Sequence, residues 1–162
     1  MYLGKSEIER RIAREGLLKN CDIENVQGAG YDMCIDKLFL LNSPAFLGVK
    51  ERRLPSLHEV EGKVFLLSPG SYYLCLTKES VSMPEDLVAF LQPRSTLFRC
   101  GVSLRNAVID PGYVGQLTIG IKNDGGQEFK LEKGSRIAQI VFSELKGDAS
   151  SYNGKYQGGK VV

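Results

Sequence analysis

From residue 64 onward the chain is a succession of short apolar or β-favouring runs separated by tight turns, and this pattern limits its possible folds most strongly. Gly, Pro, Asn and Asp cluster between the runs, as they do where strands reverse direction. Many short strands at close spacing, with one or two helices, predict a mainly β protein: a compact antiparallel β-barrel or double-sheet roll. The runs cover residues 64–67, 72–76, 88–91, 117–123, 129–131 and 137–142.

Two helices are expected, one before the strand-rich region and one at a break within it. Ser6 followed by Glu9 matches a capping box, and Gly16 is a suitable stop for an N-terminal packing helix. A second, short helix is expected after Pro93. Residues 42–62 are polar and contain prolines and the cluster Lys50-Glu51-Arg52-Arg53, so they predict a long solvated loop.

Composition describes an ordinary soluble chain and excludes several partner classes. The 162 residues suffice for one domain, which we place at residues 1–150, followed by a flexible tail over residues 151–162. The net charge of +2 is spread among mixed signs, so neither nucleic acid nor a membrane is an expected partner. Four widely spaced cysteines and no signal-like or membrane-spanning run favour a cytoplasmic protein. His58 is the single histidine, which disfavours a Cys/His metal cluster.

The first chemical motif is Arg94-Ser95-Thr96, with Arg99 shortly after it. Hydroxyls at the start of a helix can bind phosphate oxygens together with the free backbone amides. Guanidinium groups pair bidentately with phosphate, which favours an anion site. The alternative is that Ser95 only caps the helix.

The second motif is the turn Asp110-Pro111-Gly112-Tyr113, which follows the apolar run Ala107-Val108-Ile109. Its carboxylate could orient a water for attack on phosphorus, and its tyrosine could support a sugar ring. The alternative is a purely structural Asp-Pro-Gly turn. The C-terminal tail, with Tyr152, Lys155 and Gln157 on a glycine-jointed segment, is either a frayed end or a lid over an aromatic anion.

Two further polar residues lie in or beside expected strands. Asp32, after the glycine-rich entry Gly28-Ala29-Gly30, could hold a water of a bound magnesium ion, or could simply be a turn or edge-strand residue. Gln139 interrupts a core strand, so its amide needs a partner, either structural or a ligand.

Taken in order, these segments resemble the motifs of the superfamily of dUTPases and dCTP deaminases. The resemblance spans nearly the whole chain, and its tail is similar to that of the deaminase branch. The spacing between Arg94 and Asp110 is also closer to the deaminase branch than to common dUTPases. The matching segments are residues 28–32, 93–97, 109–115, 134–139 and 152–158.

The resemblance implies a homotrimer with active sites at subunit interfaces and a magnesium ion bridging a nucleoside triphosphate. Asp110 would position the attacking water and touch the 3′-hydroxyl, while Tyr113 would pack on deoxyribose. The hairpin Asn106-Ala107-Val108 would read the base through main-chain groups. The triphosphate would contact the remaining residues, namely Arg94, Ser95, Thr96, Arg99, Gln139, Tyr152, Lys155 and Gln157.

One position separates the two branches. Deaminases of this superfamily resemble one another in carrying a glutamate ten residues past the aspartate of the third motif, where it shuttles protons. Counting from Asp110 reaches Gly120, which cannot move a proton, and Asp124 lies in the following turn. We therefore expect a dUTP diphosphatase that removes dUTP from the nucleotide pool and supplies dUMP. The alternatives are a dCTP deaminase, mono- or bifunctional, and a non-catalytic nucleotide-binding regulator.

Overall fold

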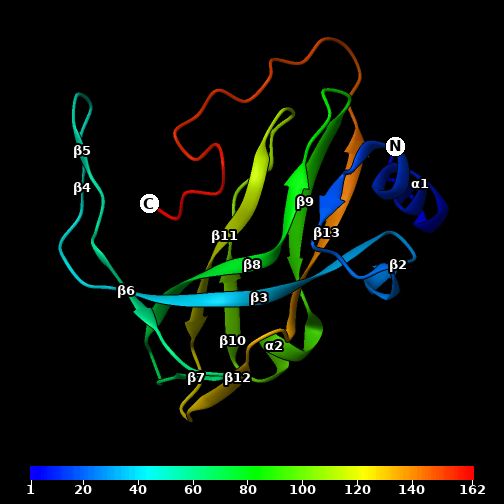
Figure 1. Ribbon diagram of the computed structural model, residues 1–162. Coiled ribbons are helices and arrows are strands. Elements are labelled where there is room, and N and C mark those ends of the chain that lie inside the picture. Colours follow the sequence, from blue (N-terminus) through cyan, green and yellow to red (C-terminus); the bar gives the residue numbers. More distant parts are fainter.

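The computed structural model describes residues 1–162 and is built mainly of antiparallel strands (Figure 1). The helical segments are α1 (Lys5–Glu15), the 3-10 turn η1 (Ile23–Asn25) and α2 (Ser95–Arg99). None of them is long and apolar enough to cross a membrane. The strands are β1 (Leu18–Lys19), β2 (Val26–Gln27), β3 (Gly30–Leu41), β4 (Phe46–Leu47), β5 (Arg52–Arg53), β6 (Leu57–Val60), β7 (Val64–Leu67), β8 (Tyr72–Ser82), β9 (Leu87–Pro93), β10 (Val102–Arg105), β11 (Val114–Asn123), β12 (Phe129–Glu132) and β13 (Arg136–Glu144).

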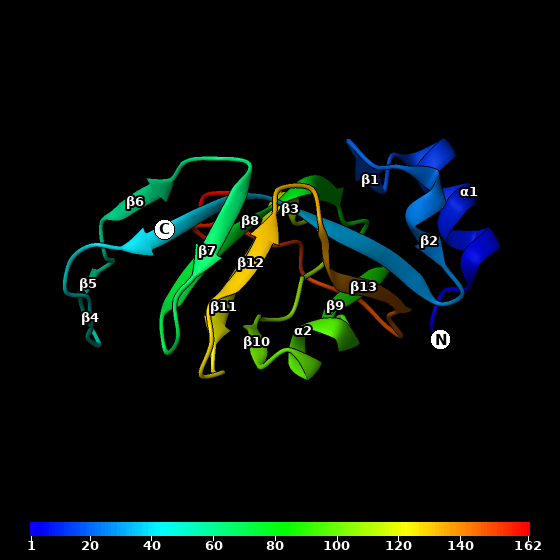
Figure 2. The same cartoon turned by 90° about the horizontal axis from the view of Figure 1, so that it is seen from below.

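The main sheet runs in the order β10-β11-β8-β3-β13-β9, and every neighbouring pair is antiparallel. The outer strand β9 is bonded through Ala89 to Ile109, in the segment between β10 and β11. The sheet therefore nearly closes on itself, as its curvature in Figure 2 indicates. This near-closed sheet confirms the barrel-like, mainly β fold expected from the spacing of the runs.

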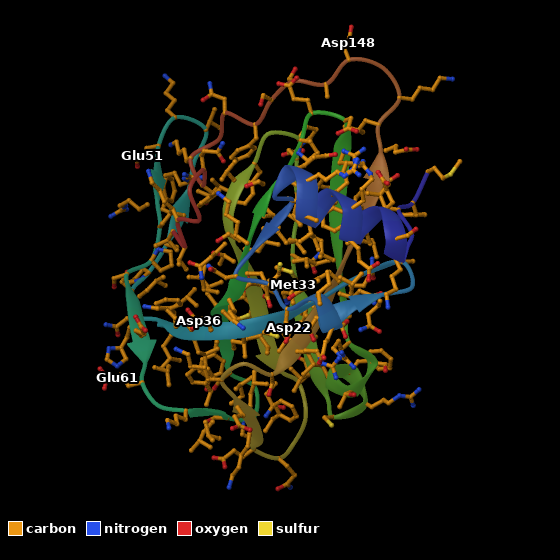
Figure 3. The ribbon with its side chains drawn as sticks, turned by 45° about the vertical axis from the view of Figure 1, so that its right-hand side comes forward. Asp22, Met33, Asp36, Glu51, Glu61 and Asp148 are labelled. Atoms are coloured by element: carbon orange, nitrogen blue, oxygen red, sulfur yellow. The ribbon has the colours of Figure 1, made fainter.

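The interior is a single apolar cluster with the largest side chains at its centre. Tyr31, Met33, Phe65, Ile119 and Phe142 are among its fully buried members. Figure 3 shows Met33 inside the molecule, on β3. Burial of such side chains removes apolar surface from water and is the main driving force for this fold.

A buried carboxylate ties the start of β3 to β8. Glu79 is fully buried and accepts hydrogen bonds from the Tyr31 hydroxyl (3.2 Å) and the Cys34 amide (2.9 Å). The Tyr31 hydroxyl in turn accepts a bond from the Asp22 amide (3.0 Å), and burial raises the pKa of Tyr31. This network fixes the segment of β3 that carries Asp32.

Helix α1 begins earlier than the capping-box pattern predicts. Its N-cap is Gly4, and no side chain caps it, so the prediction that Ser6 caps the helix is wrong. The physical reason is that backbone bonds fix the entry: Leu3 donates to the Phe142 carbonyl and Lys5 to the Gly28 carbonyl. The predicted stop is correct, because Gly16 takes the left-handed conformation at φ 67°.

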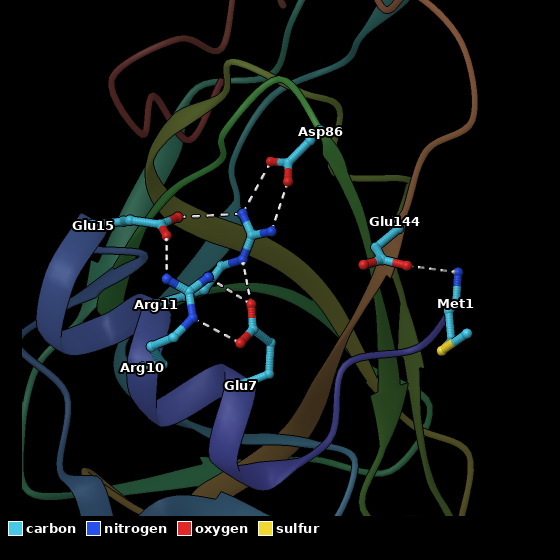
Figure 4. Close-up of polar contacts among 7 residues, drawn as sticks. All are labelled: Met1, Glu7, Arg10, Arg11, Glu15, Asp86 and Glu144. Atoms are coloured by element: carbon cyan, nitrogen blue, oxygen red, sulfur yellow. Dashed lines mark hydrogen bonds and ion pairs between the residues drawn. The ribbon is translucent and has the colours of Figure 1, made fainter.

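The helix is held to the sheet by an ion-pair cluster around Arg11 (Figure 4). Arg11 donates to both carboxylate oxygens of Asp86, at 3.0 and 2.6 Å, and also reaches Glu7 and Glu15. The Arg11 guanidinium lowers the pKa of Asp86. This bidentate pair joins α1 to the turn before β9.

The polar segment 42–62 is not the plain loop that the sequence predicted. It contains the β4–β5 hairpin, and β6 pairs with the far end of β3, Leu57 lying opposite Leu41. The prediction failed because the pairing of β6 depends on a distant strand and not on an apolar run of its own. Figures 1 and 3 show the hairpin extending from the body, with Glu51 at its end.

Candidate functional site

A cavity of about 370 Å³ opens between the turn that follows β10, strand β11 and the C-terminal tail. This volume is within the range of small-molecule sites. Asp110 is the one carboxylate that lines it. The other lining residues are Leu91, Asn106, Ala107, Val108, Ile109, Tyr113, Leu117, Thr118, Tyr152, Tyr156, Lys160 and Val161.

The turn that carries Asp110 is fixed at both sides. Ile109 exchanges two backbone hydrogen bonds of 3.0 Å with Ala89, and the Tyr113 amide donates to the Asp110 carbonyl at 3.3 Å. Gly112 has φ 75°, a left-handed conformation that disfavours larger residues. A Cβ there would also lie 3.0 Å from the Tyr152 amide nitrogen. The exposed Asp110 side chain is thus presented from a rigid turn.

Tyr113 forms a wall of the cavity and is nearly buried. Its hydroxyl donates to the Gln116 carbonyl at 2.7 Å, which fixes the ring. Burial raises the pKa of Tyr113 above its ordinary value. The Tyr152 ring meets it edge to face, with the centroids 5.4 Å apart. The two rings give the cavity an aromatic surface suited to a sugar or base.

The turn after β10 presents backbone rather than side-chain polar groups. The Asn106 side chain donates to the Leu91 carbonyl at 3.1 Å, so its amide is used within the chain. Ala107 and Val108 follow it and have no polar side chains. Readout of a base here would therefore depend on main-chain donors and acceptors.

Thr118 is a cavity residue that the motifs did not indicate. Its hydroxyl oxygen is buried and has no hydrogen-bond partner, although it lines the cavity. A buried polar atom of this kind is costly unless a ligand or a water satisfies it. The only sequence signal is its place in an alternating strand, which does not show that its hydroxyl is buried without a partner.

The tail lies along the start of β11 and the Asp110 turn. The Tyr152 amide donates to the Pro111 carbonyl at 2.7 Å, and the Gly158 amide to the Val114 carbonyl at 2.8 Å. The Gln157 side chain accepts from the Val114 amide and donates to the Gly112 carbonyl, both at 2.9 Å. Lys155 stays exposed. Tyr152, Lys155 and Gln157 are thus near the cavity, and of these Tyr152 lines it.

The predicted phosphate-binding residues form a second group at α2. Ser95, Thr96 and Arg99 are exposed, and the N-cap is Arg94, which has no side-chain cap bond. The alternative in which Ser95 caps this helix is therefore wrong. The Arg99 guanidinium lies 5.7 Å from the Phe98 ring centroid and forms no ion pair within the chain.

Asp32 and Gln139 belong to this second group. Asp32 is almost fully buried and pairs with the guanidinium groups of Arg94 and of Arg136, the latter at 3.3 Å. Gln139 lies opposite Asp32 in the β3–β13 register, and its amide has no partner within the chain. A Cβ at position 30 would lie 2.9 Å from Gln139 Cγ, which explains why Gly30 precedes this pair.

The two groups do not meet within one chain. None of the α2 group lines the cavity, and Figure 1 places α2 well away from the C-terminal tail. A single chain therefore does not bring all the predicted site residues together.

The chain does not form a metal site by itself. No three acidic, histidine or cysteine side chains gather as a ligand set. Asp32 contacts both guanidinium groups through the same oxygen, Oδ2, so its negative charge is already balanced by two positive groups. Its contact with magnesium through a water stays a prediction.

Gly120, at the position that distinguishes the two branches, is covered by a neighbouring ring. It lies between Leu74 of β8 and Arg105 of β10. A Cβ at this position would overlap the Tyr72 hydroxyl and lie 2.8 Å from Tyr72 Cζ. Asp124, the nearest acid along the chain, is bonded to Lys122 (2.7 Å) and Ser103 (2.6 Å). Position 120 therefore lacks an acid, and the end of the Tyr72 side chain lies where a Cβ would be.

The fold and the ordered motifs define a nucleotide-processing β-barrel class, and comparison with known proteins identifies its family. Residues 2–145 match the model of the dCTP deaminase-like family, and the chain belongs to that family. Both types of enzyme occur among its similar proteins.

A probable deoxyuridine 5′-triphosphate nucleotidohydrolase of Methanothermobacter thermautotrophicus is 38% identical over 134 residues, covering 83% of this chain and 89% of that protein. A dUMP-forming dCTP deaminase of Persephonella marina is 32% identical over 98% of this chain and 92% of its own length. The crystal structure of a dCTP deaminase from Agrobacterium tumefaciens matches the fold with a TM-score of 0.71 and 24% identity. That match covers 87% of this chain and about half, 47%, of the deaminase chain.

Proposed function

We propose that this protein is a dUTP diphosphatase that converts dUTP and water to dUMP and pyrophosphate. The observation that carries the proposal is the contrast between two positions. Asp110 presents a carboxylate to the cavity. Gly120, by contrast, has no acidic side chain that could act on a nucleobase, and the Tyr72 side chain covers it. Several archaeal relatives, including those of Methanothermobacter thermautotrophicus and Archaeoglobus fulgidus, are named as probable enzymes of this type.

In this mechanism Asp110 accepts a hydrogen bond from a water and orients it toward the α-phosphorus. The new bond joins the water oxygen to the α-phosphorus, and the bond to the bridging oxygen of the β-phosphate breaks. Pyrophosphate leaves with the bonding electrons, and the water's proton passes by way of Asp110 to solvent. Tyr113 packs against the deoxyribose, and backbone groups of residues 106–108 contact the base. Any magnesium ion would arrive with the triphosphate, since the chain offers no ligand cluster of its own.

The α2 group supplies the positive charge that this reaction requires, and we place it in a neighbouring subunit. Ser95, Thr96 and Arg99 are exposed and have no polar partner in their own chain, which suits a contact across an interface. In a homotrimer the α2 group of one subunit would face the cavity of the next. The developing charge on the phosphates would then be stabilised by hydroxyl and guanidinium groups that are already in place. Gln139, Lys155 and Gln157 would complete these contacts.

The primary test is pyrophosphate release from dUTP, dCTP, dTTP and UTP, with and without magnesium. We expect release from dUTP, and its loss by at least a hundredfold in Asp110→Asn, because the variant keeps the shape of the turn but not the charge. Wild-type turnover by Asp110→Asn would refute the mechanism. Ammonia release from dCTP would support the deaminase alternative, and dUTP binding without turnover would support a regulator.

Subunit complementation tests the interface site. Asp110→Asn and a Ser95→Ala/Arg99→Ala variant, each inactive alone, are unfolded together, refolded as a mixture and assayed. If the site is shared, random assortment restores about a quarter of the sites, because each active site needs one intact half from each variant. No recovery, in assemblies whose measured mass is three times 17.9 kDa, would mean that each site lies within one chain.

A further inference from the structure

The β4–β5 hairpin, which the proposed function leaves without a role, reaches the C-terminal tail through a hydrogen bond and a cation–π contact of Arg52. We propose that Arg52 is a positioning residue that holds the tail over the cavity by binding Tyr156. The catalytic consequence rests on the proposed dUTP hydrolysis, whereas the structural contact does not.

Two interactions join the same pair of side chains. Arg52 Nη1 donates to the Tyr156 hydroxyl at 3.3 Å, and the guanidinium carbon lies 5.5 Å from the centroid of the Tyr156 ring. A guanidinium at this distance is attracted to the face of the ring. The contact spans 104 positions in the sequence, so it fixes two distant segments relative to each other.

The contact continues into the site. Tyr156 lines the cavity, and its backbone amide donates to the Tyr152 hydroxyl at 3.3 Å. Tyr152 in turn packs edge to face on Tyr113. A continuous series of contacts therefore runs from Arg52 on the hairpin to the aromatic wall beside Asp110.

Arg52 is the hairpin residue whose hydrogen bond and cation–π contact reach the tail. The other polar and cation–π contacts of residues 42–56 stay within that segment. Figures 1 and 2 both show the C-terminus approaching the hairpin from the side of the body. The tail is otherwise held by the bonds of residues 152, 157 and 158 to the Asp110 turn and the start of β11.

The next residue offers a matched control. Arg53 has the same charge and the same strand, but its guanidinium lies over the Phe46 ring within the hairpin, 5.9 Å from the centroid. Arg53→Ala therefore removes an equal charge without touching the tail. Arg52→Lys keeps a cation near Tyr156, and Tyr156→Phe keeps the ring but loses the hydroxyl.

The first experiment measures tail opening without nucleotide, as the rate at which trypsin cleaves after Lys155 and Lys160, followed by intact mass. We expect Arg52→Ala to raise this cleavage rate about three- to tenfold, because the loss of the contact increases the fraction of molecules with an open tail by that factor. The cleavage rate of Arg53→Ala should match that of the wild type. The rates of Arg52→Lys and Tyr156→Phe should lie between those of the wild type and Arg52→Ala.

The second experiment measures dUTP kinetics of the same variants. Because saturating substrate favours the closed tail, Arg52→Ala should raise KM by a similar factor and leave kcat within about twofold. Wild-type cleavage rates and KM in Arg52→Ala, or an equal effect of Arg53→Ala, would overturn the proposal. If the wild type released no pyrophosphate, the proposed function would fail, while faster cleavage in Arg52→Ala alone would still support the contact.

Discussion

We expect Gly120→Ala to lower the free energy of unfolding in the wild type and to raise it in a Tyr72→Ala variant. This change of sign tests whether the Tyr72 side chain fills the space beside Gly120. In the wild type a Cβ would overlap the end of the Tyr72 ring and approach Arg105 Cβ to 3.2 Å. The ring must turn away, which loses packing worth about 1–2 kcal/mol. Alanine also restricts the unfolded chain, which restores about 0.5–1 kcal/mol. The net expectation is a loss of about 1 kcal/mol.

In a Tyr72→Ala background the ring is absent, so only the stabilising effect of alanine on the unfolded chain remains. Gly120 has no positive φ, so alanine fits its backbone without strain. We therefore expect Gly120→Ala to stabilise Tyr72→Ala by about 0.5–1 kcal/mol. The coupling energy between the two positions is then about 2 kcal/mol, well within the range of residues in contact.

The assay is urea-induced unfolding of the four proteins at one fixed protein concentration, since the proposed homotrimer would make stability depend on concentration. A loss of about 1 kcal/mol corresponds to a fall in Tm of roughly 2–4 °C for a chain of this size. If Gly120→Ala were neutral or stabilising in the wild type, the Tyr72 ring would not occupy the space beside Gly120, and an acid could fit at that position.

Three further predictions concern other parts of the molecule. Thr118→Val should leave Tm unchanged or higher but raise KM for dUTP about three- to tenfold, because it removes a buried hydroxyl that has no partner within the chain and that bound substrate would satisfy. An unchanged KM would exclude a substrate contact. Glu79→Ala should lower the urea-derived free energy of unfolding by about 3 kcal/mol, and Glu79→Gln by less, because the alanine leaves the Tyr31 hydroxyl and a backbone amide without an acceptor. The lowered pKa of Asp86 gives stability that is present above its unfolded pKa, near 4, and is lost as pH falls through the folded value. Asp86→Asn should flatten that acid limb, and an unchanged limb would mean that the Arg11 pair does not contribute.

The sequence predicted the fold well because its signals were local. Turn residues between apolar runs define the strands, and the left-handed Gly16 ends α1 as expected. The start of α1 was missed, since backbone bonds to distant strands override the capping box at Ser6. The β4–β5 hairpin and β6 were missed because their pairing partners cannot be read from a polar segment.

The site was only partly predictable, for a related reason. Asp110 and Tyr113 belong to a turn whose residues show its geometry, so their presence at the cavity could be predicted. Thr118 gives no such signal, because an orphaned hydroxyl is a property of the packed structure. The pairing of Asp32 with Arg94 and Arg136 could not be predicted either, because the three residues lie on or beside strands that are far apart in the sequence.

The proposed choice between hydrolysis and deamination depends on positions 72 and 120 rather than on overall similarity. Relatives named as dUTP nucleotidohydrolases and as dCTP deaminases share 32–38% identity with this chain, so identity does not separate the two activities. We expect that a single change of Gly120 to glutamate would not produce the arrangement that the resemblance implies for deaminases, because the end of the Tyr72 side chain would first have to move away. We therefore expect the residue types at positions 72 and 120 to be coupled. It follows that relatives with an acid at the position of Gly120 should carry a smaller or differently directed side chain at the position of Tyr72. An aligned set of deaminases that kept both the acid and the tyrosine, with the ring in this orientation, would refute that coupling.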